Sequence, residues 1–203
     1  MKYPAIESKR FTGSEPIVYN DNKVSDLLSF WQWAYSDLVG NTERGALAEY
    51  IVACALGINN EARISWGRYD MVTPQGVTIE VKASGYLQTW EQQELSKIKF
   101  GISETFGWDN ITNKYDNERK RQAQIYVFCV HSHTEQETIN PLDISQWEFY
   151  ILPTDILNRE SRLKPQKTIS LSALVKLEAQ KCEYRNLLTE IEKHVDQNIV
   201  VGG

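Results

Sequence analysis

The stretch Val77-Thr78-Ile79-Glu80-Val81-Lys82-Ala83 alternates apolar and polar residues, and it decides how the rest of the chain is interpreted. Side chains of a β-strand point alternately to the two faces of a sheet. Thr78, Glu80 and Lys82 therefore share one face of the predicted strand, and the apolar residues share the other. We expect the apolar face to pack on a core while the opposite face presents an acid beside an amine.

A turn sequence, Thr73-Pro74-Gln75-Gly76, precedes this strand and follows another extended stretch, residues 63–72. Pro74 suits the first central position of a type I turn. Gly76 suits the left-handed residue that closes a three-residue loop. The sequence therefore predicts a β-hairpin.

The length of the hairpin loop sets the partner of Asp70. A three-residue loop places Asp70 opposite Glu80, with Cβ atoms about 4.5–5.5 Å apart. A two-residue loop would place it opposite Ile79. Two carboxylates that close repel each other unless a positive charge lies between them. A Mg²⁺ ion fits this requirement, because it binds carboxylate oxygens and keeps several waters.

A third acid, Glu49, lies in a predicted helix over residues 42–56. Between Ala46 and Leu56 it is the one residue that is neither apolar nor aromatic. Burying a carboxylate is costly unless a cation, a donor or a metal meets it. We expect Glu49 to approach the hairpin from the helix and to bind a second ion or a water on the first.

This set of residues suits the hydrolysis of a phosphodiester. A metal held by Asp70 and Glu80 would lower the pKa of a bound water and would bind the phosphate. Lys82 could orient or deprotonate that water, or stabilise the charge of the transition state.

These features together resemble the PD-(D/E)XK nuclease superfamily, which has the restriction-endonuclease-like fold. The matching pieces are the apolar helix segment 45–52 with its single acid, Glu49, then Asp70, then nine residues, then Glu80-Val81-Lys82. The chain departs from the pattern at Tyr69, where the superfamily name implies proline. The resemblance implies an α/β fold with a central mixed β-sheet flanked by helices.

The resemblance also implies the role of each site residue. Asp70, Glu80 and the carbonyl of Val81 would bind Mg²⁺, for which Mn²⁺ can substitute. Lys82 would be the catalytic lysine, and Glu49 would match the helix acid of the superfamily. The function implied is that of a magnesium-dependent endonuclease, a hydrolase that acts on nucleic acid, with DNA preferred over RNA.

Outside this set, several residues are candidates for contact with nucleic acid. Ser84 and Gln88 follow the catalytic strand, and Arg119-Lys120-Arg121 is the best candidate for a phosphate contact. The net charge of −5 argues against generic coating of nucleic acid and favours recruitment by a protein partner. The resemblance also allows a homodimer, because many enzymes of this fold act as dimers to cut both strands. Gln122 and Tyr126 have the spacing of RecB-type members. We attribute this to chance, since they run into an apolar stretch.

We predict a single nuclease-like domain over residues 1–203, with its catalytic core at about 43–157. Its other parts are an irregular lead-in before a helix at 24–38, strands at 97–102, 125–130 and 147–152, long loops at 103–118 and 132–146, and a helix at 170–194. Trp31 and Trp33 are expected to pack. The 125–130 run is wholly apolar, which predicts a strand buried on both faces.

The composition, 41% hydrophobic and 24% charged, is that of an ordinary globular protein. No apolar run approaches the ~18 residues of a membrane span, and the first residues lack a signal-peptide core. We therefore expect a cytoplasmic protein without membrane contact. The three cysteines form no CxxC pair, which makes a zinc site unexpected.

Two other functions remain open on the sequence alone. One is a catalytically silent nucleic-acid-binding or structural subunit with the same fold. The other is a glycoside hydrolase, whose retaining carboxylates lie ~5–5.5 Å apart. Metal binding without cleavage of any substrate would favour the silent subunit, and metal dependence would separate the glycoside hydrolase from the nuclease.

Overall fold

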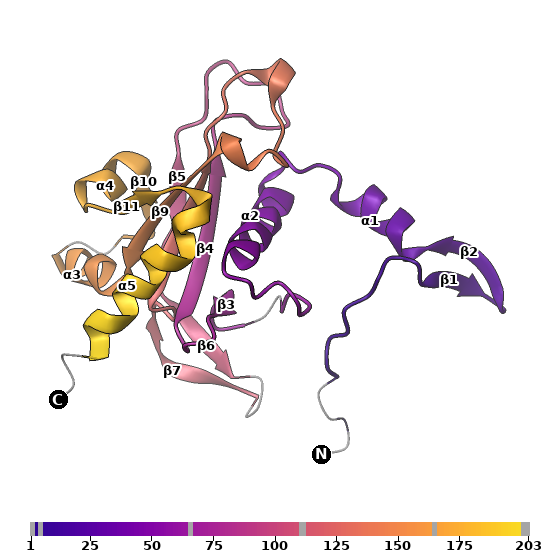
Figure 1. Cartoon of the computed structure of the whole chain (residues 1–203), viewed down its shortest axis with the longest axis horizontal. Coiled ribbons are helices and arrows are strands. Elements are labelled where there is room, and N and C mark those ends of the chain that lie inside the picture. The colour runs from indigo at the N-terminus through magenta and orange to yellow at the C-terminus, as the bar shows by residue number, and fades with distance from the viewer. Residues whose placement is uncertain (1–2, 4–5, 65–66, 110–112, 164–165, 200–203) are drawn as a thin grey trace.

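A five-stranded mixed β-sheet forms the centre of the molecule (Figure 1). The computed structural model describes residues 3, 6–64, 67–109, 113–163 and 166–199. The strand order is β11-β9-β8-β4-β3, with β4 parallel to β8 and the other neighbours antiparallel. The strand bounds are β3 (Met71–Val72), β4 (Thr78–Gly85), β8 (Ile125–His131), β9 (Trp147–Pro153) and β11 (Gln180–Cys182). The predicted α/β architecture with a central mixed sheet is thus confirmed.

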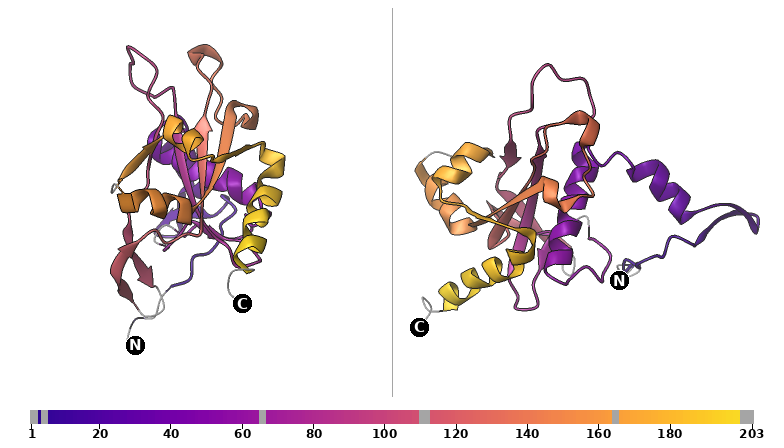
Figure 2. Two further views of the ribbon diagram at one scale, coloured as in Figure 1. Left: turned by 90° about the vertical axis from the view of Figure 1, so that its left-hand side faces the viewer. Right: turned by 45° about the horizontal axis from the view of Figure 1, so that its top comes forward.

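Helices cover both faces of this sheet (Figure 2). α2 (Asn41–Ala55) and α5 (Leu187–Ile199) pack on one face. α3 (Thr154–Leu163) and α4 (Leu171–Lys176) pack on the other. None of the helices in the described part of the chain is both long and apolar enough to cross a lipid bilayer.

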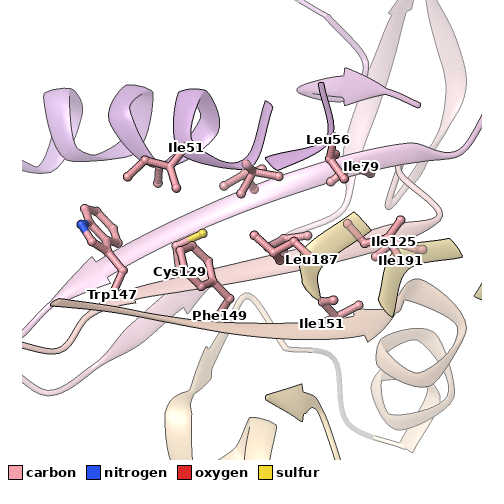
Figure 3. Close-up of a cluster of buried hydrophobic side chains, with 14 of the residues drawn as sticks. Ile51, Leu56, Ile79, Ile125, Cys129, Trp147, Phe149, Ile151, Leu187 and Ile191 are labelled. Carbon is pink, nitrogen blue, oxygen red and sulfur yellow. The ribbon is translucent and has the colours of Figure 1, made fainter. Parts of the chain in front are cut away.

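The core is divided into two layers by β8, whose seven residues are all buried. Val127 and Cys129 join the layer beneath α2 and α5, which Figure 3 shows together with Ile79 of β4 and Phe149 of β9. Phe128 joins the layer beneath α3 and α4. The predicted strand buried on both faces is therefore confirmed, and so is the strand predicted at 147–152.

The segment between β4 and β8 contains strands where a long loop was predicted. β5 (Lys99–Gly101) pairs with β10 (Thr168–Ser170) outside the central sheet. β6 (Thr105–Asp109) and β7 (Lys114–Lys120) form a separate two-stranded ribbon, so the prediction of a loop at 103–118 was wrong. The other predicted loop, 132–146, holds two 3₁₀ turns, Gln136–Thr138 and Ile144–Gln146.

The N-terminal segment forms an arm that lies apart from the sheet (Figures 1 and 2). It contains β1 (Pro16–Tyr19), β2 (Asn22–Asp26) and α1 (Leu27–Tyr35). The helix predicted at 24–38 begins only at Leu27, because Asp26 caps it by accepting the Ser29 N–H. No α1 residue is buried and Trp33 is 85% exposed, so the expectation that Trp33 packs was wrong.

The helix predicted at 170–194 is broken into several elements. α4 ends near Glu178, whose φ of 58° takes the chain out of the helical direction. β11 then pairs with the free edge of β9, and a 3₁₀ turn, Tyr184–Asn186, leads into α5. The break lets α4 and α5 cover opposite faces of the sheet, which one continuous helix could not do.

Candidate active site

The β3–β4 hairpin has the three-residue register predicted from its turn. Val72 pairs with Thr78, Met71 pairs with Ile79, and the Thr73 N–H donates to the Val77 carbonyl over 2.9 Å. Gly76 closes the loop with a φ of 86°, in the left-handed region expected for it. The two-residue alternative is therefore excluded.

The regular strand pairing ends at Met71, and the Asp70 side chain makes the next hydrogen bond to β4. The Asp70 N–H donates to the Ile79 carbonyl over 3.0 Å. Its Oδ2 accepts the N–H of Val81 over 2.7 Å. The carboxylate is therefore held against β4, at the residue that follows Glu80.

Three acids act on one another at this point. The pKa of Asp70 is raised to about 7 by burial and by the negative charges of Glu80 and Glu49, which outweigh the Val81 hydrogen bond and the charge of Lys82. The largest cause is burial of the carboxylate, which disfavours its charged form. The predicted acids thus lie close enough to affect the pKa of Asp70, and the charge of Asp70 is the least well offset by a cationic partner.

Glu80 and Glu49 each have a cationic partner. Lys82 Nζ lies 2.5 Å from Glu80 Oε1. Arg63 holds Glu49 with two bonds, 2.5 Å from Nε and 2.6 Å from Nη2. No group of three His, Cys, Asp or Glu side chains is arranged to hold a metal ion within the described ranges. The partner Arg63 was not identified from the sequence. It begins the stretch predicted as extended, 63–72, of which only Met71–Val72 is a strand among the described residues.

A cavity of about 230 Å³ lies on this face of β4. Its wall includes Glu80 and Lys82 from the strand, together with Arg68, Thr105, Gln122 and Tyr126. Gln122 and Tyr126, whose spacing had been attributed to chance, therefore line the same cavity as the predicted catalytic pair. Burial and the charge of Glu80 raise the pKa of Tyr126, which keeps its hydroxyl protonated as a donor.

The residues that follow Lys82 differ in their surroundings. Ser84 is partly buried on the strand. The Gln88 amide donates to the Gly85 carbonyl over 2.9 Å and accepts from Arg44 over 3.3 Å. Arg44 is itself buried, and a Cβ at Gly85 would lie 2.9 Å from its Nη1. Gln88 therefore connects the loop after β4 to α2, and contact with nucleic acid remains a prediction for it and for Ser84.

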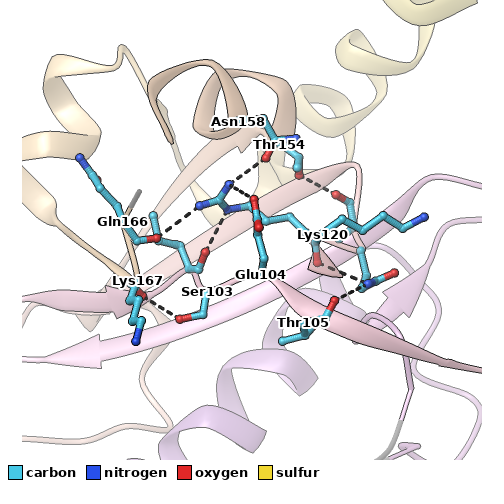
Figure 4. A network of polar contacts seen from close by, with 12 residues as sticks. Ser103, Glu104, Thr105, Lys120, Thr154, Asn158, Gln166 and Lys167 are labelled. Carbon is cyan, nitrogen blue, oxygen red and sulfur yellow. Dashed lines mark hydrogen bonds and ion pairs between the residues drawn. The ribbon is translucent and has the colours of Figure 1, made fainter. Parts of the chain in front are cut away.

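The basic run at the end of β7 divides into two surface residues and one internal residue. Arg119 and Lys120 are exposed. The Arg121 side chain is 1% exposed; its Nε donates to the Ile102 carbonyl over 2.9 Å and its Nη1 to Asn158 over 2.8 Å. Figure 4 shows the network that these bonds join. The expectation that Arg121 contacts phosphate was wrong, because its guanidinium is enclosed by the protein.

Arg121→Ala is expected to destabilise the fold by about 2–5 kcal/mol, because it leaves buried acceptors without their charged donor. Urea unfolding measures this change. Lys120→Ala, at the neighbouring exposed position, is the matched control and should stay within about 0.5 kcal/mol of the wild type. Equal stability of the two variants would contradict an internal role for Arg121.

Comparison of the chain with known protein families identifies the family to which it belongs. Residues 17–173 match the family described as bacteriophage T4 endonuclease IV, which is well over half of the 203 residues. The match includes the arm strands, the β3–β4 hairpin, the cavity wall and β8. A search of individually curated proteins gave no match. The chain belongs to the bacteriophage T4 endonuclease IV family, and it is therefore a nuclease that acts on DNA.

Proposed function

We propose that the chain is a metal-dependent DNA endonuclease of the PD-(D/E)XK type, with its active site at Asp70, Glu80 and Lys82. The observation that carries the proposal is the half-buried Asp70 carboxylate, which accepts the Val81 N–H beside Glu80 and has a pKa raised to about 7. Such a group lowers the stability of the fold, and groups with strongly shifted pKa values are concentrated at functional sites. Asp70 interacts with Glu80 and Lys82, which line the cavity, so a role in binding a metal ion there fits its position.

The donor set fits a hard divalent cation. Carboxylate and carbonyl oxygens are the ligands that Mg²⁺ and Mn²⁺ prefer. The described residues that line the cavity include no cysteine or histidine. Asp70 and Glu80 would hold the ion, with the Val81 carbonyl as the third ligand implied by the family resemblance. When bound, the cation supplies Lewis acidity and offsets the negative charge of the acids.

The remaining groups would position the substrate and the attacking water and donate hydrogen bonds to them. Lys82 Nζ, now 2.5 Å from Glu80, can donate to a phosphate oxygen or hold the attacking water in the cavity. Arg63 clamps both oxygens of Glu49, so Glu49 acts on the centre through its charge and not as a free ligand. The Tyr126 hydroxyl stays protonated and can donate to the substrate backbone.

The two alternative functions, a glycoside hydrolase and a silent subunit, are less well supported, each for a different reason. The family is one of endonucleases, which gives no support to a glycoside hydrolase. A silent subunit would have no need of a costly buried acid at Asp70 beside an intact Lys82. That alternative remains the outcome that a failed cleavage test would favour.

The test is cleavage of circular single-stranded and duplex DNA by the purified chain, with Mg²⁺, with Mn²⁺ and with EDTA. We expect strand breaks only with metal, and none from Asp70→Asn. Glu135→Gln, which removes an exposed acid outside the site, is the matched control and should cut like the wild type. Cleavage in EDTA, or full activity of Asp70→Asn, would reject the metal-dependent site.

A further inference from the structure

Among the described residues the β6–β7 ribbon pairs with no third strand, and it extends beyond the end of the central sheet (Figure 1). We propose that this ribbon is the surface on which the DNA backbone docks, and that the Arg68–Asp116 ion pair holds it in position over the active-site cavity. The proposal rests on the proposed function and names the substrate-binding element of that site.

The ribbon is held in one shape by contacts of its own. A lone two-stranded ribbon is marginally stable in water. Here Trp108 packs on Tyr115 with ring centroids 4.7 Å apart, and the Arg119 guanidinium lies 5.0 Å from the centre of the Phe106 ring. These contacts give the ribbon a fixed surface that a ligand can meet without first ordering it.

The exposed chemistry of the ribbon suits a polyanion with stacked bases. Lys114, Arg119 and Lys120 are exposed on β7, and none of them forms a salt bridge with a side chain in the described part of the chain. Tyr115 is 64% exposed and Phe106 45%. Exposed cations next to aromatic faces are the usual combination for binding a nucleic-acid backbone and its bases.

The N-terminal arm provides a contrast within the same molecule. It also exposes aromatic rings, among them Trp33 and Tyr19. Over residues 6–39, however, it has three bases against five acids. Over residues 105–120 the ribbon has three bases and three acids, and one of these acids, Asp116, is paired with Arg68. The arm is the more acidic of the two surfaces, so the ribbon is the better site for phosphate.

The base of the ribbon is joined to the catalytic face of β4. Arg68 lines the cavity with Glu80 and Lys82, and it holds Asp116 of β7 at 2.8 Å and 3.2 Å. A Cβ at residue 107 would lie 2.5 Å from Asp116 Oδ2, so Gly107 leaves the space in which this acid meets Arg68. A backbone that lies along the ribbon therefore enters the cavity, and Arg68 acts as a positioning residue for it.

The first test is binding without catalysis. Fluorescence anisotropy of a labelled mixed-sequence DNA strand, in EDTA and from 50 to 300 mM NaCl, compares wild type with Arg119→Gln/Lys120→Gln. Each lost phosphate contact lowers the slope of log affinity against log salt by about 0.7–0.9, so we expect a slope shallower by about 1.5. Lys9→Gln/Lys176→Gln makes the same charge change at exposed positions on the arm and on α4, and should keep the wild-type slope. An unchanged slope in the ribbon variant overturns the docking surface.

The second test separates positioning from affinity. Asp116→Asn frees the ribbon from Arg68, and kcat at saturating DNA should fall roughly 10- to 100-fold while affinity in EDTA is retained. Asp116→Glu, which restores the charge, should recover most of the rate. Unchanged kcat in Asp116→Asn overturns the positioning role. Because the binding data are collected without metal, failure of the ribbon is distinguishable from failure of the metal site, which only cleavage by Asp70→Asn reveals.

Discussion

Replacement of Lys82 with methionine is expected to slow DNA cleavage by about 10²–10⁴-fold, the usual contribution of a positioned acid–base group. Methionine keeps most of the length of the side chain and removes its charge and its donors. The loss should be in kcat, because the Lys82 ammonium lies next to Glu80 in the cavity and not on the ribbon. Single-turnover cleavage with enzyme in excess measures the chemical step directly.

Lys176→Met is the matched control for this experiment. Lys176 is exposed at the end of α4, far along the chain from the cavity wall, and its loss should leave the rate unchanged. A Lys82→Met enzyme as fast as the wild type would remove Lys82 from the catalytic set. It would leave the family assignment intact, because that assignment rests on the match over residues 17–173.

Asp70→Asn should abolish cleavage and yet stabilise the metal-free protein at pH 8, by up to roughly 4 kcal/mol. The pKa of Asp70 is raised from 3.8 to about 7 in the folded chain. The folded state therefore binds a proton more tightly than the unfolded state does. Stability falls as the pH rises from about 4 to about 7, and above pH 7 the full cost of the charged group remains. An amide cannot ionise, so it avoids this cost and can still accept the Val81 N–H.

Urea unfolding in EDTA at pH 5 and pH 8 measures both parts of this prediction. The wild type should lose stability between the two pH values, and the variant should lose less. Adding Mg²⁺ at pH 8 should stabilise the wild type and not the variant, since binding to the folded state adds stability by mass action. A variant that is less stable than the wild type at pH 8 would show that Asp70 is adequately compensated by its neighbours.

The parts of the fold that could be predicted are those in which local pattern and tertiary structure agree. Alternation in 77–83 identified β4 and the face that carries Glu80 and Lys82, because the period of a strand is fixed by backbone geometry. Pro74 and Gly76 fixed the loop length, and the loop length fixed the register. The apolar run of β8 identified the strand that both core layers share.

The parts that could not be predicted depend on contacts between distant segments. β11 is a strand because the edge of β9 is free to pair with it, which no pattern in 170–194 reveals. Arg63 meets Glu49 across 14 residues of helix end and loop, so the helix acid had no visible partner in the sequence. Arg121 resembled its two basic neighbours in sequence, and only the enclosure by α3 and the Ile102 carbonyl sets it apart.

The parallel pairing of β4 with β8 also governs the order in which the chain can assemble during synthesis. Thr78 and Gln124 meet across 46 residues, and closing so long a loop precedes any gain from the pairing. A nascent chain that ends before Ile125 has no neighbour on that side of β4, so the strand bearing Glu80 and Lys82 is without half of its support. A slip of one residue would turn these side chains into the core. We therefore expect the face that carries Glu80 and Lys82 to form only after β8 has left the ribosome, so that the unfinished chain lacks the proposed active site.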